Sequence, residues 1–397
     1  DRVDPLAAYR DRFVIDDDTV IYLDGNSLGR LSKDARERVV QALDTEWGRD
    51  LILSWDERWL GLPTRIGDLL GTSLLGADAR EVIVGDSTTI SLYKAIAAAL
   101  DARSGRRAIV IEEDNFPTDR YIVASLAEQR GLDVRWIPEA GPEGVSLGDL
   151  DAVLDDDVAL AVLSHVDYRS AAILDMAAMT AAVHAVGALA IWDLCHSVGV
   201  VPIDLHSADV DLAVGCTYKY LSAGPGAPAF TYVRRDLQSQ LRQPIWGWFG
   251  RRDQFDMGPG YDPAPGIASW QTGTTAVLSM VGVEPSVALV AEAGVEAIRR
   301  KSELLTALAV DLHDQRLAEL GWTLQSPRDP AHRGSHITVS HPAARQVMDE
   351  VIALGVIPDF RRPDGIRLGL APLTTRLVDV FDGIERLATA TPPVATP

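Results

Sequence analysis

Short apolar runs alternate with longer amphipathic stretches between about residues 80 and 233. Seven of the runs are strand-like, at residues 81–84, 108–111, 133–137, 159–164, 188–193, 212–215 and 229–233. Helical patterns lie between them, for example at residues 89–100, 119–130 and 176–186. Continuous apolar runs are typical of strands buried on both faces, and their alternation with helices indicates parallel pairing. We therefore predict a large α/β domain built on a mostly parallel, seven-stranded sheet.

The pattern changes after a stretch rich in Gly and Pro at residues 247–273. A long helical segment is predicted over residues 276–320, followed by strands at 322–325, 336–340 and 366–370 and a helix near 343–354. This mixture predicts a smaller α+β domain at the C-terminal end. We expect residues 1–50 to form an arm that belongs partly to this small domain, residues 51–275 the large domain, and residues 276–397 the small domain.

Composition narrows the class of protein. The 397 residues carry 37 Lys and Arg against 57 Asp and Glu, so the formal net charge of −20 disfavours nucleic-acid and anionic membrane partners. Two cysteines cannot build a disulfide framework and fit a reducing compartment. No apolar run approaches the roughly 18 residues of a membrane helix, and the first ten residues do not resemble a signal peptide. We expect a soluble cytoplasmic protein, most simply an enzyme.

The segment LAVGCTYKYLSAGPGAP, residues 212–228, carries the clearest candidate chemistry. Lys219 follows an apolar strand and has aromatic neighbours, which would desolvate its amine and favour a nucleophile. The small residues after it would let backbone N–H groups approach a phosphate. A strand-end lysine that simply reaches solvent is the alternative.

A second candidate is the segment IWDLCHS, residues 191–197. Asp193 closes a strand, where ligands of open α/β sheets bind, and an Asp there can pair with a protonated heterocyclic nitrogen. A metal pair with His196 is disfavoured because no further His or Cys ligand lies nearby in the sequence. An Asp that caps the next helix is compatible with the ring-binding role.

Two further segments follow predicted strands. GDSTTISLY, residues 85–93, places hydroxyl residues at a helix start, which suits a phosphate but is also an ordinary N-cap pattern. NFPTDRY, residues 115–121, offers the ring of Phe116 and the carboxylate of Asp119; a loop Phe can equally be core. The chain has no Walker sequence, and its Gly-Pro-Gly turn does not open a dinucleotide-binding unit, so NAD is not expected.

Together these segments resemble the kynureninase family, pyridoxal-phosphate enzymes of the class V aminotransferase-like group with the aspartate-aminotransferase fold. The matching segments are residues 22–29 (YLDGNSLG), 116–121 (FPTDRY), 192–199 (WDLCHSVG), 215–221 (GCTYKYL), 247–250 (GWFG) and 365–372 (GIRLGLAP). They occur in family order over nearly the whole chain. The resemblance implies cleavage of L-kynurenine to anthranilate and L-alanine, in tryptophan catabolism and NAD biosynthesis.

The resemblance also implies roles for individual residues. Lys219 would form the Schiff base with pyridoxal 5'-phosphate, Asp193 would pair with the ring nitrogen, and Tyr218 would contact the phosphate and donate a proton. The rest of the expected cofactor site comprises Thr88, Thr89, Phe116, Pro117, Thr118, Asp119, Ser164, His196, Trp248 and Thr274, with no metal. Arg367 would bind the substrate α-carboxylate, with Asn26 and Ser27 beside it. Trp248 and Thr274 match positions contributed by a neighbouring subunit, which implies a homodimer with shared active sites.

Three other functions remain compatible with the fold. A cysteine desulfurase needs a reactive Cys on a mobile loop, whereas Cys195 and Cys216 lie in strand-end motifs. An aminotransferase usually recognises two acceptor acids, and one well-placed Arg is apparent. A non-catalytic pyridoxal-binding protein would not need the Asp193 and Lys219 pair. Members of the animal type carry Ser-Asn where this chain has Gly273 and Thr274, and favour a 3-hydroxy ring; we therefore expect a preference for the unsubstituted ring.

Overall fold

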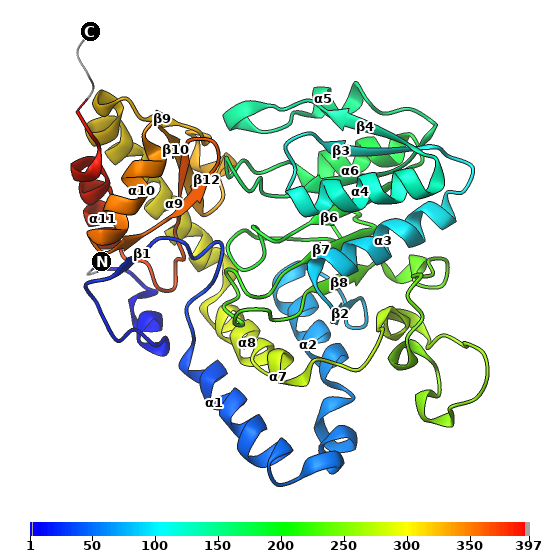
Figure 1. Ribbon diagram of the computed structural model, residues 1–397. Coiled ribbons are helices and arrows are strands. Elements are labelled where there is room, and N and C mark those ends of the chain that lie inside the picture. Colours follow the sequence, from blue (N-terminus) through cyan, green and yellow to red (C-terminus); the bar gives the residue numbers. More distant parts are fainter. Residues whose placement is uncertain (2, 394–397) are drawn as a thin grey trace.

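The large domain is organised around one twisted sheet, as the alternating pattern predicts. The computed structural model describes residue 1 and residues 3–393. The seven strands lie in the order β2-β8-β7-β6-β5-β3-β4, and only β8 runs antiparallel to its neighbours (Figure 1). Their bounds are β2 Val82–Val84, β3 Ala108–Glu112, β4 Asp133–Ile137, β5 Val158–Ser164, β6 Leu189–Asp193, β7 Leu212–Gly215 and β8 Phe230–Val233. The predicted α/β class is confirmed.

Helices cover both faces of this sheet. Residues that alternate along a strand point to opposite faces, so Val110 joins one apolar core and its neighbours Ile109 and Ile111 join another. Helices α3 and α4 pack on one face, and α2, α6 and α8 on the other. The helices of this domain and its connections are α1 Lys33–Gln41, α2 Leu62–Leu70, α3 Thr88–Ala102, α4 Pro117–Arg130, α5 Leu147–Asp151, α6 Met176–Ala185, α7 Val277–Met280 and α8 Val283–Ala293.

A smaller α+β unit follows, with its own apolar core (Figure 1). Its four-stranded antiparallel sheet has the order β12-β13-β10-β9, and a parallel pair joins β11 to β1 in the N-terminal arm. The strands are β1 Ile21–Tyr22, β9 Thr323–Leu324, β10 His336–Ser340, β11 Val356–Ile357, β12 Asp359–Arg361 and β13 Gly365–Gly369; the helices are α9 Val295–Leu312, α10 Ala344–Ala353 and α11 Leu377–Ala390. The arm therefore pairs with residues more than 300 positions away.

The predicted continuous helix over residues 276–320 is wrong in detail. It is divided into α7, α8 and α9, and the break between α8 and α9 lies at Gly294, whose φ of 79° suits glycine. No single helix in the described part of the chain is long and apolar enough to cross a membrane, although the pair Val277–Ala293 and Val295–Leu320, bent by 78°, passes that test together.

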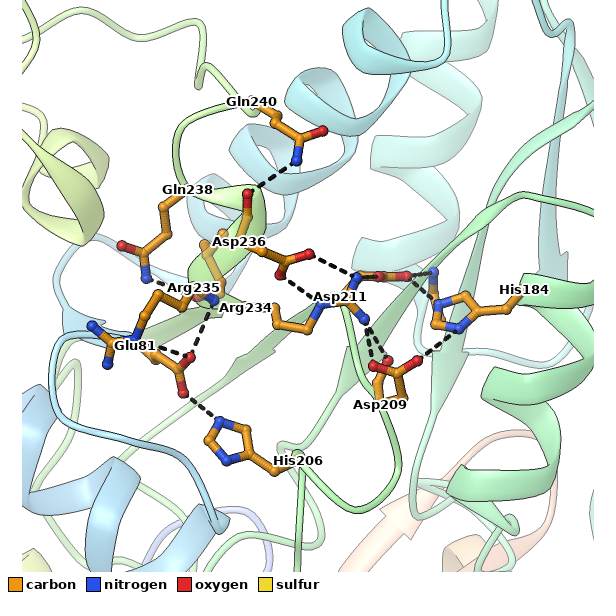
Figure 2. Close-up of polar contacts among 12 residues, drawn as sticks. Glu81, His184, His206, Asp209, Asp211, Arg234, Arg235, Asp236, Gln238 and Gln240 are labelled. Atoms are coloured by element: carbon orange, nitrogen blue, oxygen red, sulfur yellow. Dashed lines mark hydrogen bonds and ion pairs between the residues drawn. The ribbon is translucent and has the colours of Figure 1, made fainter.

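A polar network joins the sheet at the amino ends of β6 and β7 (Figure 2). The candidate site residues Asp193 and Lys219 follow the opposite, carboxyl ends of these strands. Buried Asp211, just before β7, accepts from the backbone N–H of Ala190 at 2.8 Å and contacts His184 Nε2 at 2.7 Å. Arg234 contacts both Asp211, at 3.2 Å, and Asp209, at 2.7 Å. This network ties α6, β6, β7 and the end of β8 together.

Candidate active site

A cavity of about 470 Å³ opens beside the carboxyl ends of the central strands, the usual ligand position in an open α/β sheet. Nine of the predicted site residues line it: Thr88, Thr89, Phe116, Thr118, Asp119, Asp193, Tyr218, Lys219 and Thr274. They come from segments spread over nearly 190 positions of the chain. The fold therefore assembles most of the predicted cofactor site at one place.

Lys219 lies in the short loop after β7, and the loop is held from both sides. Thr217 Oγ1 donates to the carbonyl of Pro228 at 2.7 Å, and the Gly29 N–H donates to the carbonyl of Tyr218 at 2.8 Å. The Lys219 Nζ lies 3.3 Å from His196 Nε2 and 5.7 Å from the centroid of the Phe116 ring. The amine is thus placed among partners rather than extended into solvent, so the solvent-reaching alternative is not what the structure contains.

Burial and positive neighbours keep His196 neutral. The imidazole is buried, and burial lowers its pKa, with a further lowering from the charges of Lys219 and Arg367. A neutral imidazole can accept a hydrogen bond from the lysine ammonium. His196 can therefore accept a hydrogen bond from the Lys219 amine and so orient it.

Two carboxylates face the same cavity. Asp193 is the last residue of β6, and its Oδ1 accepts from the Cys195 N–H at 2.8 Å. The carboxylate therefore caps the turn after the strand and also faces the cavity. Asp119, in the first turn of α4, is buried, and its Oδ2 has no hydrogen-bond partner among the described residues. Burial and the charges of Asp193 and Glu112 raise the pKa of Asp119. This orphaned polar atom on the wall suits a polar ligand atom.

The start of α3 offers a candidate anion site on the cavity wall. Ser87 caps α3 by accepting from the Ile90 N–H, and Thr88 and Thr89 follow in the first turn on the cavity wall. A helix start with hydroxyls and free N–H groups binds phosphate. The small residues Gly226 and Ala227 complete this wall. Amine, carboxylate and anion site together fit pyridoxal phosphate, with Lys219, Asp193 and the α3 start as the residues that would hold it.

Four predicted cofactor residues stand outside the cavity wall: Pro117, Ser164, His196 and Trp248, the last of which is described below with Thr274. Pro117 opens α4 and fixes the turn that presents Thr118 and Asp119. Ser164 is buried at the end of β5, where its N–H donates to Glu112 Oε1 at 2.9 Å and its hydroxyl to Asn115 Oδ1 at 3.3 Å. His196 reaches the site only through Lys219. Among these, Pro117 and Ser164 act on the site through the chain segments that they support.

Arg367 lies in β13 and is 1% exposed. Its Nη1 donates to the Tyr168 carbonyl at 2.7 Å and its Nη2 to Ser27 Oγ at 2.7 Å. With the Asn26 amide oriented by its hydrogen bonds, its oxygen accepts from Arg367 Nε at 2.8 Å. The three predicted substrate residues thus form one cluster. Gly369 allows this approach, since a Cβ there would lie 1.8 Å from the Asn26 side chain.

The two residues predicted to serve a neighbouring subunit, Trp248 and Thr274, are in contact, but only Thr274 lines the cavity. Trp248 Nε1 donates to Thr274 Oγ1 at 3.3 Å. Thr274 lines the cavity of its own chain, whereas Trp248 does not and is 38% exposed. Trp248 packs edge-on against Phe255, which is also exposed. The indole is therefore available to a surface outside this chain.

Several residues of the site were not predicted. Asp359 contacts Arg367 across the β12–β13 pair, and His336 in β10 lies with its ring 5.6 Å from that of His196. Asp86 lines the cavity and binds both buried Lys94, at 2.7 Å, and Thr272, at 2.9 Å. The turn DFRRPDG before β13 and the Asp after the first strand of the domain were the available signals, but neither contains a recognisable motif.

One group in the described part of the chain has the spacing of a metal site: Asp78, Glu81 and His206. Glu81 is already engaged there, since its Oε2 contacts His206 at 2.6 Å and accepts from the Asp78 N–H at 2.9 Å (Figure 2). None of the three lines the cavity.

Comparison with known proteins identifies the family of this chain. Residues 298–387 match the kynureninase C-terminal domain family. A kynureninase of Burkholderia mallei is 45% identical over 98% of this chain and 92% of its own length, and one of Pseudomonas fluorescens is 43% identical over the same shares.

Solved structures agree at the level of the fold. A cysteine desulfurase of Thermococcus onnurineus superposes with a TM-score of 0.81 over 94% of both chains at 16% identity. A C-DES variant with glycine linked to its pyridoxal-phosphate cofactor gives 0.82 over 93% of this chain and 96% of its own, also at 16% identity. The 43–45% identity to kynureninases over nearly the full length of this chain shows that the chain belongs to the kynureninase family.

Proposed function

We propose that this protein hydrolyses L-kynurenine to anthranilate and L-alanine with pyridoxal 5'-phosphate as cofactor. The observation that carries the proposal is the meeting of Lys219, Asp193 and the hydroxyl-rich start of α3 on one cavity. Held by these residues, pyridoxal phosphate would supply an electron sink for cleavage of the bond beside the substrate carbonyl. The remaining steps depend on side chains of this chain.

Lys219 is the proposed proton carrier at the substrate α-carbon. Its amine stands 3.3 Å from His196 Nε2, so the imidazole can hold it toward the cavity. Asp193 supplies the negative charge that keeps a ring nitrogen protonated, and the Cys195 N–H fixes the orientation of that carboxylate. Asp119, with its free oxygen, is proposed to accept or donate to a polar group of the cofactor.

Tyr218 is proposed as the donor of the final proton. Burial raises the pKa of Tyr218, so the phenol keeps its proton at neutral pH and cannot serve as a resting-state base. It lines the cavity next to Lys219. The start of α3, which would hold the cofactor phosphate, lines the same cavity, and a phosphate there could restore the proton of Tyr218.

Arg367, with Asn26 and Ser27, is the proposed site for the substrate α-carboxylate. Burial lowers the pKa of Arg367, yet a guanidinium keeps its charge at any physiological pH. Its planar fork can hold a carboxylate with two parallel hydrogen bonds, a geometry that lysine cannot reproduce. Its hydrogen bonds to Asn26 and Ser27 fix the plane of the fork.

The rival desulfurase chemistry is disfavoured by both cysteines. Cys195 and Cys216 are buried, and the Cys216 N–H donates to Cys195 Sγ at 3.2 Å. Hydrogen bonding with Cys216 and burial both raise the pKa of Cys195. Both thiols are buried, so neither has the exposure that a sulfur acceptor on a mobile loop needs.

We also propose a cytoplasmic homodimer. A run of exposed apolar side chains lies on the helical connection after α1, and Trp248 and Phe255 add two exposed rings elsewhere on the surface. The run comprises Leu43, Trp47, Leu51, Ile52 and Leu53. Exposed apolar clusters of this kind mark association surfaces, and a second copy of the chain is the partner that the family implies.

The proposed preference is for the unsubstituted aromatic ring. Thr274 on the cavity wall offers one hydroxyl and a methyl group, so an added ring hydroxyl would be desolvated without a matched partner. Purified protein supplied with pyridoxal phosphate should form anthranilate and alanine in equal amounts from L-kynurenine. Its kcat/KM should be higher for L-kynurenine than for 3-hydroxykynurenine, and sulfide release from L-cysteine as the faster reaction would overturn the proposal.

A further inference from the structure

The proposed carboxylate-binding Arg367 already holds a carboxylate in this structure. Asp359 in β12 is the direct cross-strand partner of Arg367 in β13, and its Oδ2 lies 2.7 Å from Arg367 Nη2. The same oxygen lies 2.6 Å from Arg361 Nε, two residues along the same strand. Asp359 therefore stands between two guanidinium groups.

Few hydrogen-bond donors of Arg367 remain for a substrate. A guanidinium has five N–H groups; those of Arg367 donate to the Tyr168 carbonyl, Ser27 and Asn26, while the Asp359 carboxylate lies 2.7 Å from Nη2 as an ion pair. A carboxylate held by two parallel hydrogen bonds needs two free N–H groups. Asp359 occupies the space beside Nη2, so it has to move before a substrate carboxylate can reach Arg367 in this way.

Asp359 is the partner that can leave most easily. The contacts to Tyr168, Ser27 and Asn26 are aligned hydrogen bonds, whereas Asp359 Oδ2 makes no aligned hydrogen bond within the described residues. Its second cation, Arg361, is 30% exposed and so can follow it.

Charge balance argues for the same displacement. Arg367 and Arg361 face two carboxylates, Asp359 and, at 4.0 Å from Arg367, Asp24. The burial of this group makes an unpaired third negative charge costly. If the substrate carboxylate takes Arg367 and Asp359 stays with Arg361, every charge in direct contact keeps a partner.

We propose that Asp359 is the resting counter-ion of Arg367, and that the substrate α-carboxylate displaces it onto Arg361. This inference rests on the proposed carboxylate role of Arg367. Asp359 then lowers the affinity for amino-acid ligands by occupying their site, while Arg361 assists binding by receiving Asp359. If Asp359 only held Arg367 in place, removal of the Asp359 carboxylate would lower the affinity for amino-acid ligands instead of raising it.

Calorimetric titration of the pyridoxal-phosphate-loaded enzyme with L-alanine and L-alaninamide tests the displacement. L-Alaninamide lacks the carboxylate, so its affinity measures the contacts that the ligand makes through its other groups. Asp359→Asn should bind L-alanine roughly tenfold more tightly than the wild type, because the competing state is removed. Arg361→Gln should bind L-alanine more weakly, and the double variant should recover the tight binding of Asp359→Asn. L-Alaninamide binding should change little throughout.

The control is Asp349→Asn, which removes an exposed carboxylate paired with Arg345 at 3.2 Å in the same domain; it should leave both affinities unchanged. Weaker or unchanged L-alanine binding by Asp359→Asn would overturn the displacement. So would an Arg361→Gln enzyme with wild-type affinity, which remains informative if Asp359→Asn does not fold. A wild-type enzyme that cleaves L-kynurenine but binds alanine no better than alaninamide would refute the carboxylate role of Arg367 itself.

Discussion

Gly29 lies directly against the backbone that carries Lys219. Its N–H donates to the Tyr218 carbonyl at 2.8 Å, and a Cβ at position 29 would lie 2.4 Å from the Lys219 carbonyl oxygen and 2.2 Å from Ser222 Oγ. The turn of the N-terminal arm thus forms the back of the lysine loop. This contact explains why the arm motif YLDGNSLG and the lysine motif GCTYKYL occur together in this chain.

Gly29→Ala should therefore displace the lysine loop. We expect a loss of roughly 1–3 kcal/mol in the free energy of unfolding, typical of overpacking, together with a lower kcat. Gly105→Ala is the matched control, because a Cβ at Gly105 meets no atom within 4 Å. Denaturant unfolding and steady-state kinetics measure both effects. A Gly29→Ala enzyme with the kcat and stability of the control would show that the contact does not position Lys219.

Replacement of Asp193 and of Arg367 by alanine should impair different properties of the enzyme. Asp193→Ala removes the charge proposed to face the cofactor nitrogen, so the loss should fall on cofactor retention and kcat. Arg367→Ala removes a buried charged contact to the substrate, worth roughly 2–5 kcal/mol in kcat/KM, and should spare cofactor binding. Equilibrium dialysis of the cofactor and kinetics separate the two. Equal cofactor loss in both variants would contradict the division, and exposed Arg345→Ala serves as the control.

Sequence patterns predicted the sheet because all of its strands except the edge strand β4 are buried on both faces. Val158–Ser164, for example, is a continuous apolar run that only a buried strand accommodates at this length. The motif residues Asp193 and Lys219 could be placed at one edge because both follow parallel-sheet strands. The antiparallel direction of β8 and the break at Gly294 depend on packing between distant segments, which local periodicity does not record.

The substrate side of the site was harder to predict completely. Arg367, Asn26 and Ser27 followed from resemblance, but Asp359 joins them only through the register of β12 and β13. His336 belongs to the small domain and His196 to the large domain, yet their rings lie 5.6 Å apart. Such partners are set by tertiary contacts between residues with no common motif.

The cross-subunit role of Trp248 predicts complementation between two inactive enzymes. Lys219→Ala lacks the amine, and Trp248→Ala lacks the exposed indole. If Trp248 serves the partner's cavity, each mixed dimer has one intact site, so random exchange of equal amounts should restore about one site in four. Activity after mixing under exchange conditions measures this. No recovery, with exchange verified by labelled subunits, would place Trp248 in the site of its own chain.

The pair of His184 and Asp211 should make stability depend on pH. Hydrogen bonding to Asp211 raises the pKa of His184 above its ordinary value of 6.5 (Figure 2). The stabilisation is therefore complete below pH 6.5 and is lost as the pH rises through the raised pKa. His184→Gln should lower Tm by about 2 °C more at pH 6 than at pH 9, given the partial exposure of the pair. His332→Gln, at an exposed histidine, is the control; an equal effect of His184→Gln at both pH values would contradict the pairing.

The attachment site of the cofactor shows whether Lys219 is the lysine that holds pyridoxal phosphate. Borohydride reduction of the pyridoxal-phosphate-loaded enzyme, followed by peptide mass spectrometry, locates the lysine that becomes covalently joined to the cofactor. We expect one label per chain, on the peptide that contains Lys219, and none in Lys219→Ala protein that retains its fold. A label on Lys33, Lys94 or Lys301 instead, or no label in an enzyme that cleaves L-kynurenine, would contradict this role of Lys219.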